Sequence, residues 1–337
     1  IVMVKLKKTM KMKKIYITLL LVTMLVALVA GTLVGCGPKA DYTVGIIQFM
    51  PHGALDKANE GFRDELTRLM KEAGKTVKFE NKNAQGEQAN NTTIADTLVS
   101  KNVDLIYAIA TPSAQAAVNA TSKTPILFNA VTDPVDAGLV KSATKPDCNV
   151  SGCSDMNPIA KQVELMTQLV PNAKKFGVLY TAGERNSEIQ ANMVVEECKK
   201  YNIAVEVEKI NDINDIGNAL GSLKSNGAQC VYIPTDNVLA DAASTVHAQN
   251  TTGKYNLPIV CGDETMTSHC GVATYGLDYY NLGVIAGKMA FEILVNGKDV
   301  STMPVEFQTD NFKLTTYKNI ASAIGFDIPQ SVIDMVK

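Results

Sequence analysis

The 337-residue sequence lacks tryptophan, contains no C-x-x-C pair and has no basic cluster after its first 14 residues. Nucleic acid is held by clustered Lys and Arg side chains, so this distribution argues against DNA or RNA as a partner. The three histidines, His52, His247 and His269, are scattered, which together with the missing C-x-x-C pair argues against a zinc site. With 6% aromatic residues, the composition gives no support to a stacking platform for an indole. We expect neither a metal nor a cofactor.

The sequence also lacks the short motifs of the common enzyme classes. G-x-S-x-G, G-x-x-x-x-G-K, H-E-x-x-H and the dinucleotide-binding G-x-G-x-x-G do not occur. The stretch GVIAGK at 283–288 is one residue short of a phosphate-binding loop and falls within a predicted helix. An enzyme is the competing class of function, and we expect that the protein is not one.

The N-terminus has the layout of a secretory signal. Basic residues at 5–14 precede an uncharged apolar stretch at 15–34, which ends in Gly35, Cys36 and Gly37. A membrane-spanning helix over 15–34 is the alternative, since about 20 residues cross a bilayer. Leu33-Val34-Gly35-Cys36 resembles the bacterial lipobox, whose cysteine carries the lipid. We expect a signal peptide at 1–35, a linker at 36–41, and lipidation of Cys36 that anchors the protein outside the cytoplasm to the cell membrane.

Six cysteines follow the predicted anchor. Cys198, Cys230 and Cys261 lie in apolar patterns that are typical of small core residues. Cys148 and Cys153 could form a short disulfide at an exposed bend, or stay unpaired. The sequence likewise leaves the state of Cys261 and Cys270 open.

Strand-like and helix-like stretches alternate along the rest of the chain. Strands are predicted at 42–49, 76–80, 104–110, 125–131, 176–180, 204–208, 229–233, 258–261 and 271–277. Helices are predicted at 55–73, 88–100, 112–120, 158–169, 187–201, 213–225, 238–249 and 282–294. Such alternation, with nearly continuous apolar strands, predicts α/β architecture with doubly wound parallel sheets covered on both faces.

About 300 residues after the predicted anchor are enough for two cores. The alternation pauses at 132–150, where turn residues gather, and then resumes. We therefore expect two α/β lobes joined by a hinge. Lobe 1 is predicted to comprise 42–133 and 270–300, and lobe 2 to comprise 134–269 and 301–337.

Polar residues follow the predicted strands at their carboxyl ends, where open parallel sheets bind ligands. After the strand at 104–110, Thr111 and Pro112 predict a helix start, with Thr111 as the N-cap. The backbone N–H groups of Ser113 and Ala114 would then face the cleft and bind a carboxylate. The alternative is that Thr111 only caps the helix.

Four further strand ends are also polar, and solvated loops are the alternative explanation at each of them. Together they predict a cleft that pairs both charges of a zwitterion, and Asp236 and Asp278 are the candidate partners of its ammonium group. The residues at these ends are Thr132, Asp133, Glu184, Asn186, Ser187, Asp236, Asn237 and Asp278.

These features together resemble the substrate-binding lipoproteins of ABC importers, in the family that includes tryptophan- and other aromatic-amino-acid-binding proteins. The stretches that carry the resemblance are GIIQFMPHGALDKANEGF, ATPSAQA, NAVTDPVDAGLV, VSGCSD, YTAGERNS, YIPTDN and GLDYYNLG. They span nearly the whole chain after residue 41. As a set they are specific for the family, and none of them is specific for one ligand.

The resemblance implies a type I periplasmic-binding-protein fold with the ligand held between two closing lobes. It assigns Thr111, Ser113 and Gln115 to the lobe 1 side, with Thr132 and Asp133 near the hinge. The facing positions on lobe 2 would be Glu184, Asn186, Ser187, Asp236 and Asn237. A side-chain pocket would be bordered by Phe49, Met50 and His52. Arg185 departs from the family pattern, in which a smaller residue is usual.

We therefore expect a monomer that captures a small zwitterionic solute and delivers it to the permease and ATPase of an ABC importer. An amino acid is the expected solute, and one with an aromatic side chain is among the candidates. A sensor that presents the loaded form to a receptor, and a binding protein for another class of solute, are the alternatives. Sugar-responsive transcriptional regulators share this two-lobed fold, but they need an N-terminal DNA-binding helix pair where this chain has an export signal.

Overall fold

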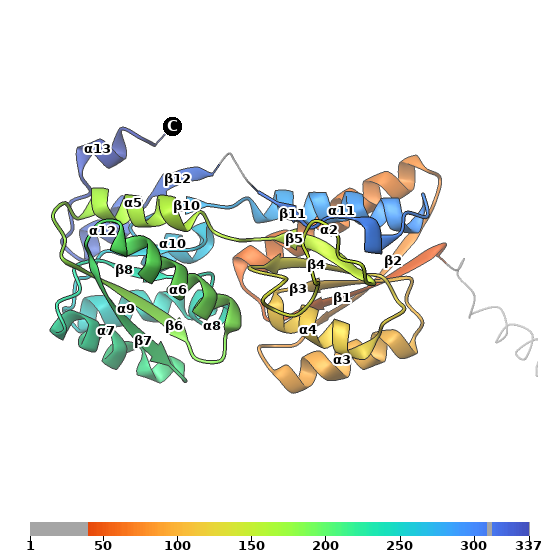
Figure 1. The fold of residues 1–337 in the computed structure, drawn as a ribbon, viewed down its shortest axis with the longest axis horizontal. Coiled ribbons are helices and arrows are strands. Elements are labelled where there is room, and N and C mark those ends of the chain that lie inside the picture. Colours follow the sequence, from red (N-terminus) through yellow and green to blue (C-terminus); the bar gives the residue numbers. More distant parts are fainter. Residues whose placement is uncertain (1–39, 309–311, 337) are drawn as a thin grey trace, which may run out of the picture. The chain divides into compact units, whose positions relative to one another are not determined.

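The computed structural model describes residues 40–308 and 312–336. The predicted signal peptide at 1–35 and the predicted lipid site at Cys36 lie outside the described residues. From Tyr42 onward the chain forms one compact unit that contains two six-stranded sheets, each with its own helices (Figure 1). The prediction of an α/β fold with two mainly parallel sheets is confirmed. We call the two sheets with their helices lobe 1 and lobe 2.

Lobe 1 is built on a sheet in which every neighbouring pair of strands is parallel. Its strands, in spatial order, are β11 (Glu306–Phe307), β5 (Val150–Ser154), β4 (Ile126–Val131), β3 (Leu105–Ile109), β1 (Tyr42–Gln48) and β2 (Val77–Asn83). The central strands β3 and β4 are buried along their whole length because helices cover both faces. The helices α2 (Gly53–Glu72) and α11 (Tyr279–Leu294) pack on one face, and α3 (Gln88–Ser100) and α4 (Thr111–Ala120) pack on the other.

The two helices α2 and α11 lie unusually close to one another because glycines line their contact. A Cβ atom on Gly283 would lie 2.2 Å from the carbonyl oxygen of Ala58, and one on Gly61 would lie 2.1 Å from that of Tyr280. Both distances are far shorter than any ordinary van der Waals contact. The glycines therefore allow α11, which is distant from α2 in the sequence, to complete the core that α2 begins.

Lobe 2 is built on a sheet that is parallel except at one edge, where β12 runs antiparallel to β10. Its strands, in spatial order, are β12 (Lys313–Thr316), β10 (Ala273–Gly276), β9 (Ile259–Cys261), β8 (Val231–Ile233), β6 (Lys175–Thr181) and β7 (Ala204–Ile210). One face is covered by α5 (Ile159–Leu169), α6 (Arg185–Lys199), α12 (Lys318–Ala323) and α13 (Gln330–Ile333). The other is covered by α7 (Ile216–Ser225), α8 (Asn237–Asp241), α9 (Ala243–Thr252) and α10 (Glu264–Cys270).

Three strands lie in a different lobe from the one expected from the sequence. The segments 134–269 and 301–337 were expected in lobe 2, but β5 pairs with β4 and β11 pairs with β5 in lobe 1. The segment 270–300 was expected in lobe 1, but β10 pairs with β9 and β12 in lobe 2, and α11 is the part that packs in lobe 1. The chain thus passes between the sheets after β5, after β10, and between β11 and β12. The short stretch VSGCS of β5 gives little strand signal within a turn-rich region, which is why its pairing was missed.

The described cysteines are free thiols. Cys153 is buried in the lobe 1 core beside Met289, whereas Cys148 packs against the apolar cluster on the opposite face of the same sheet. The short disulfide between these two positions is not formed.

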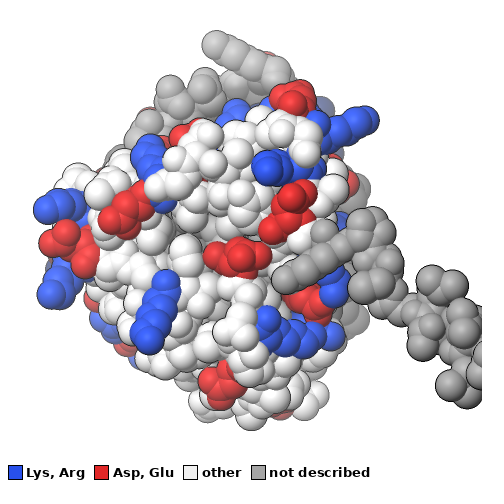
Figure 2. Space-filling model, turned by 90° about the vertical axis from the view of Figure 1, so that its right-hand side faces the viewer, with Lys and Arg blue, Asp and Glu red and all other residues white. Residues whose placement is uncertain are grey.

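The surface charge and the apolar character of the helices can be compared with those expected for other binding partners. On the face shown in Figure 2, acidic and basic side chains are interspersed over the surface. Across 40–308 and 312–336, we find no helix with the length and apolar character that crossing a bilayer requires.

Candidate functional site

A small cavity lies between the lobes at the carboxyl ends of their strands, the position at which open α/β sheets bind ligands. We call it the inner cleft. Its volume is about 10 Å³, roughly the space of one water molecule. From lobe 1 and the first crossing segment, its walls are formed by His52, Ala54, Leu55, Ala130, Thr132, Asp155 and Tyr279. From lobe 2, its walls are formed by Asn186, Thr235, Asp236, Asn237, Ala240 and Asp263.

Asp155 lies directly after β5, at the start of the first crossing segment, and is buried. Its carboxylate accepts hydrogen bonds from the hydroxyls of Tyr279, at 2.8 Å, and Thr132, at 3.3 Å. Burial raises the pKa of Asp155 to about 6, and these two hydrogen bonds offset only part of that effect. This carboxyl group is therefore sensitive to any positive charge that enters the cleft.

Asp236 is fully buried, and lobe 2 itself provides four hydrogen-bond donors to its carboxylate. One oxygen accepts from the Leu239 backbone N–H and the Thr181 hydroxyl, and the other accepts from the Thr181 backbone N–H and the Ser187 hydroxyl, all at 2.7 to 2.9 Å. Asp236 is the N-cap of α8. Its carboxylate thus holds the lobe 2 loops together, and its lone pairs are largely occupied.

Glu184 lies behind Asn186 and Asn237 and is also buried. Its Oε2 accepts hydrogen bonds from the side chains of Asn186 and Asn237 and from the Asn237 backbone N–H, at 2.9 to 3.0 Å. Its Oε1 and the Asn186 Oδ1 are buried and have no hydrogen-bond partner within the described part of the chain. Burial, with a further contribution from the charge of Asp236, raises the pKa of Glu184 to about 8. A buried oxygen without a partner is costly, and a ligand's N–H group would satisfy it once the carboxyl group ionises.

Asp263 follows β9 and is the N-cap of α10, where its carboxylate accepts the Met266 backbone N–H at 2.7 Å. Burial raises its pKa, and the nearby imidazoles of His52 and His269 act in the opposite direction. The inner cleft thus has aspartates on both sides, and His52 is the one basic side chain among its lining residues.

His52 and Thr132 of lobe 1 contact lobe 2 directly. His52 Nε2 lies 3.3 Å from Asn237 Oδ1, whereas its Nδ1 is buried with no hydrogen-bond partner among the described residues. The Thr132 hydroxyl lies 3.5 Å from that of Thr235 and accepts a hydrogen bond from Gln190 Nε2 at 3.2 Å; Gln190 Nε2 also donates to Thr235. These polar contacts join the lobes around the cleft.

Arg185 makes a second kind of contact between the lobes, at the surface. Its guanidinium donates to both oxygens of Asp136, at 2.6 and 2.9 Å, and to Glu188 at 2.7 Å. Asp136 lies in the lobe 1 loop after β4, and Arg185 begins α6 of lobe 2. Arg185 therefore forms a bidentate ion pair between the lobes.

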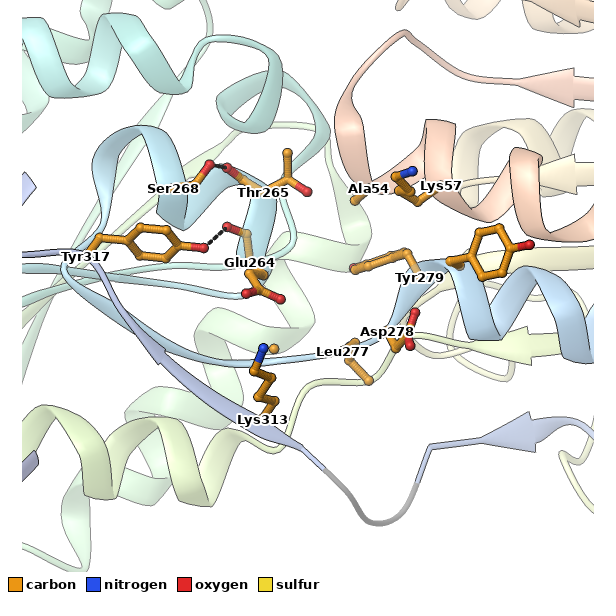
Figure 3. A pocket seen from close by; sticks show the side chains of 12 residues that line it. Ala54, Lys57, Glu264, Thr265, Ser268, Leu277, Asp278, Tyr279, Lys313 and Tyr317 are labelled. Carbon is orange, nitrogen blue, oxygen red and sulfur yellow. Dashed lines mark hydrogen bonds between the residues drawn. The ribbon is translucent and has the colours of Figure 1, made fainter. Parts of the chain in front are cut away.

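A larger cavity, which we call the outer cavity, shares Ala54 and Tyr279 with the inner cleft. Its volume is about 590 Å³. Figure 3 shows Ala54 and Lys57 from the start of α2 facing Thr265 and Ser268 of α10, with Leu277 and Asp278 of the second crossing segment below them. Asp278 is the N-cap of α11, so it borders the outer cavity and does not line the inner cleft.

The structure places several predicted residues away from the inner cleft. Ala110, with φ of 80°, is the N-cap of α4, so Thr111 is the first helical residue and not the cap as predicted. Ser113 donates to Asn91 of α3, at 2.9 Å, and Gln115 donates to the Ala137 carbonyl, at 3.1 Å. Their side chains are thus used inside lobe 1.

Four other predicted residues serve the packing or the turns of lobe 1. Ala114, Phe49 and Met50 are buried in the apolar clusters of lobe 1. The Asp133 carboxylate accepts the backbone N–H groups of Val135 and Asp136 and so fixes a turn.

Of the predicted residues, the structure brings His52, Thr132, Asn186, Asp236 and Asn237 together at the inner cleft, with Glu184 and Ser187 hydrogen-bonded behind them. The predicted set did not include Asp155 and Asp263, nor Thr235 and Tyr279, which stand next to the predicted Asp236 and Asp278 at the same strand ends. Asp263 follows a predicted strand as Asp236 does, so the same rule would have found it. Asp155 could not be found in this way, because its strand β5 was not recognised.

No cluster of His, Cys, Asp or Glu suited to holding a metal ion occurs within residues 40–308 and 312–336.

Comparison with known proteins gives consistent matches over most of the chain. The family model described as ABC transporter substrate binding protein matches residues 43–336. A tyrosine-binding protein of Clostridioides difficile (strain R20291) is 41% identical over 267 residues, which cover 79% of this chain and 76% of that protein.

Three solved structures are similar along most of their length. A Vibrio cholerae conserved domain protein has a TM-score of 0.82 at 32% identity, covering 88% of this chain and 98% of its own. A Streptococcus pneumonia protein in complex with L-Trp has a TM-score of 0.79 at 34% identity, with 87% and 98% covered. The ligand-free, open structure of a substrate binding protein with adhesive properties from Clostridium difficile has a TM-score of 0.66 at 36% identity, with 86% and 96% covered.

Proposed function

The chain belongs to the family of ABC transporter substrate-binding proteins, and from that premise we propose that it captures a free amino acid with an aromatic side chain between its two lobes. Proteins of this family work outside the cytoplasm. The bound amino acid is delivered to the permease and ATPase of the importer, and no chemical step takes place on it.

The observation that carries the proposal is the set of buried carboxyl groups in and behind the inner cleft. Burial raises the pKa values of Asp155, Glu184 and Asp263, because it penalises their charged forms. The ammonium group of an amino acid would supply a positive charge that offsets this penalty. We assign Asp155 and the unpaired Oε1 of Glu184 as its partners, because the carboxylate of Asp236 already has four donors.

The ligand carboxylate would lie on the opposite side of the cleft, at the start of α2. Ala54 and Leu55 line the cleft in the first turn of this 20-residue helix, where the backbone N–H groups have no carbonyl partner within the helix. The imidazole of His52 lies beside them, and its buried Nδ1 has no hydrogen-bond partner among the described residues. These groups together provide an anion site a short distance from the acidic residues.

Two observations support an aromatic side chain on the bound amino acid. The relatives that share most of the chain are described as binding tyrosine and L-Trp. In this chain, the outer cavity adjoins the inner cleft at Tyr279 and has space for a ring, whereas the inner cleft alone is too small for a whole amino acid.

We propose that binding needs the lobes to part and then to close. The chain superimposes more closely on the L-Trp complex than on the ligand-free, open relative. The hinge would include two of the crossing segments, residues 155–158 and residues 277 and 278. Rotation about short connecting segments is the usual way in which such lobes close on a ligand.

Isothermal titration of the purified protein tests the proposal. L-tyrosine, L-tryptophan and L-phenylalanine are the ligands, tyramine is the analogue without a carboxylate, and 3-(4-hydroxyphenyl)propionate is the analogue without an ammonium group. We expect at least one of the three amino acids to bind, both analogues to bind much more weakly, and mass spectrometry to recover the amino acid unchanged. Binding of none of the three amino acids would refute the ligand class.

We also propose that Cys36 carries the lipid anchor, on the strength of the sequence at 33–36 and the extracytoplasmic work of the family. In a bacterial host, wild-type protein should incorporate labelled palmitate and stay with the membrane fraction. The Cys36→Ser variant should lose the label. A variant that incorporates as much label as wild type would disprove this assignment.

A further inference from the structure

Cys261 and Cys270 place two buried thiols next to one another in lobe 2. Cys261 is the last residue of β9, and Cys270 is the last residue of α10. Their sulfur atoms lie 3.7 Å apart, and both side chains are at most 2% exposed. They belong to the same apolar cluster, between the sheet and its covering helix.

The surroundings of the two sulfurs favour a covalent bond between them. A disulfide needs the two Cβ atoms roughly 3.8 Å apart, with the sulfurs approaching from about van der Waals contact to about 2 Å. The other sulfur contact of Cys270 is a weak one, to the Met266 carbonyl at 3.5 Å. At 3.7 Å the two sulfurs are already at about van der Waals contact, so the side chains have to bring them closer by less than about 2 Å for the bond to form.

We propose that Cys261 and Cys270 form a reversible disulfide, which makes this pair a thiol modification site of the protein. The co-reactant is a small-molecule or protein disulfide. One cysteine thiolate attacks that disulfide and displaces one of its thiols; the second cysteine then attacks the mixed disulfide and displaces the other. Two cysteine thiols and one external disulfide thus become one internal disulfide and two external thiols, and the electrons balance.

The bond would fix α10, a helix of lobe 2 that meets the start of α2. At its N-terminal end, α10 begins after Asp263 of the inner cleft, and Thr265 lies against Gly53 of lobe 1. Glu264 accepts a hydrogen bond from Thr315 of β12. Figure 3 shows Thr265 of this helix turned toward Ala54 across the outer cavity. The disulfide would tie the opposite end of the helix to β9, and so limit the movement of a surface that the lobes share.

The exchange requires a transient opening of α10, because the thiols are buried and burial raises the pKa of Cys261 well above its ordinary value. The test therefore uses two routes to the oxidised protein. Folded protein is incubated with oxidised glutathione, and unfolded protein is refolded in a buffer of oxidised and reduced glutathione, so that burial cannot block the reaction.

Trypsin gives a direct readout, because cleavage after Lys254 and Lys288 releases a peptide in which Cys261 and Cys270 are the only cysteines. After alkylation in denaturant, we expect this peptide to be lighter than its reduced form by two hydrogen atoms and to carry no alkyl group. Reducing agent should restore double alkylation. The peptide from 225 to 254 contains only Cys230 and should be alkylated throughout, which controls for general oxidation.

Two further outcomes decide the proposal. Oxidised wild-type protein should show slower amide hydrogen exchange in α10 than reduced protein, and the Cys270→Ser variant should show no such difference. If refolded, native protein carries alkyl groups on both Cys261 and Cys270 at every glutathione ratio, the proposal is wrong. This test needs no ligand, so it succeeds or fails independently of the proposed function.

Discussion

Arg185 of lobe 2 and Asp136 of lobe 1 form a bidentate ion pair, with Nε–Oδ2 and Nη2–Oδ1 distances of 2.6 and 2.9 Å. The pKa of the Asp136 carboxyl is lowered by this guanidinium. The pair is largely open to solvent, and such pairs contribute little to the stability of a fold. Since its two partners come from different lobes, we expect it to act instead on the proposed equilibrium between parted and closed lobes.

Arg185→Gln should therefore release a bound amino acid faster without unfolding the protein. We expect the dissociation rate of L-tyrosine to rise about two- to fivefold at low salt, and the difference from wild type to shrink at high salt because salt screens exposed charges. Stopped-flow displacement at two salt concentrations measures both effects. Arg68→Gln is the matched control, because Arg68 forms a similar bidentate pair with Glu65 within one helix of lobe 1. If L-tyrosine dissociates from the two variants at equal rates, the ion pair of Arg185 with Asp136 does not slow its release.

Asp155→Asn should stabilise the protein at neutral pH. The folded-state pKa of Asp155 is about 6 against an ordinary value of 3.8, so folding favours its protonated form. The favourable contribution is fully present below about pH 4 and is lost as the pH rises through 6, which corresponds to about 3 kcal/mol. Urea unfolding should show the variant gaining stability over wild type between pH 4.5 and pH 7.5.

Glu80→Gln provides a control in which the stability difference should change with pH in the opposite direction, when the unfolding series is extended to lower pH. The ion pairs with Lys78 and Lys101 lower the pKa of Glu80 to about 2. Wild type is therefore favoured over this variant above about pH 4, and the advantage is lost as the pH falls through 2. A stability difference for Asp155→Asn that does not change with pH would show that Asp155 is ionised in the folded protein throughout this range.

Binding of an amino acid should release protons and weaken in acid. The raised pKa values of Asp155, about 6, and Glu184, about 8, mean that part of these groups is protonated before an ammonium group arrives. Because the ammonium favours the ionised carboxylates, affinity should fall as the pH drops from about 8 through 6. Titrations of L-tyrosine in two buffers of different ionisation enthalpy measure the released protons. No proton release from pH 6 to 8 would rule out these residues as the ammonium site.

Gly53→Ala should weaken ligand binding by keeping the lobes apart. A Cβ atom at Gly53 would lie 2.3 Å from Cγ2 of Thr265, which belongs to α10 of the other lobe. The fold of each lobe should be unaffected, since alanine is a better helix former than glycine. Calorimetry with L-tyrosine should show weaker binding, and the double variant Gly53→Ala/Thr265→Ala should recover affinity. If the second change brings no recovery, the clash between the lobes is not the cause.

Gly283→Ala should destabilise lobe 1, since its Cβ would lie 2.2 Å from the Ala58 carbonyl oxygen within the contact of α11 and α2. Overpacking of this kind costs about 1–3 kcal/mol. Gly287→Ala is a milder change in the same helix, because its Cβ would lie 3.0 Å from the nearest atom, the Phe62 carbonyl oxygen. Denaturant unfolding should rank wild type above Gly287→Ala and Gly287→Ala above Gly283→Ala. If Gly283→Ala is more stable than Gly287→Ala, the close contact of α11 with α2 at Gly283 does not limit stability.

The sequence predicted the two mainly parallel sheets and most of their elements, because buried strands such as β3 are apolar along their whole length and helices such as α2 repeat apolar residues every three or four positions. It did not predict how the strands divide between lobes. That division depends on pairings between distant segments, such as β11 with β5, which leave no local signal. At the cleft, the rule of polar strand ends found Asp236 and Asn186, but it could not show that Ser113 points toward Asn91 or that Asp236 is already fully hydrogen-bonded.

The order of strands also has a consequence for the synthesis of the protein. Lobe 1 receives α11 and β11 from residues 279–307, and lobe 2 receives β10 and β12 from residues 273–316. While a ribosome has made only the first 270 residues, both sheets lack strands and the core of lobe 1 lacks a helix. Neither half can reach its final form early, so a chain truncated anywhere before residue 273 leaves two incomplete lobes rather than one finished and one missing.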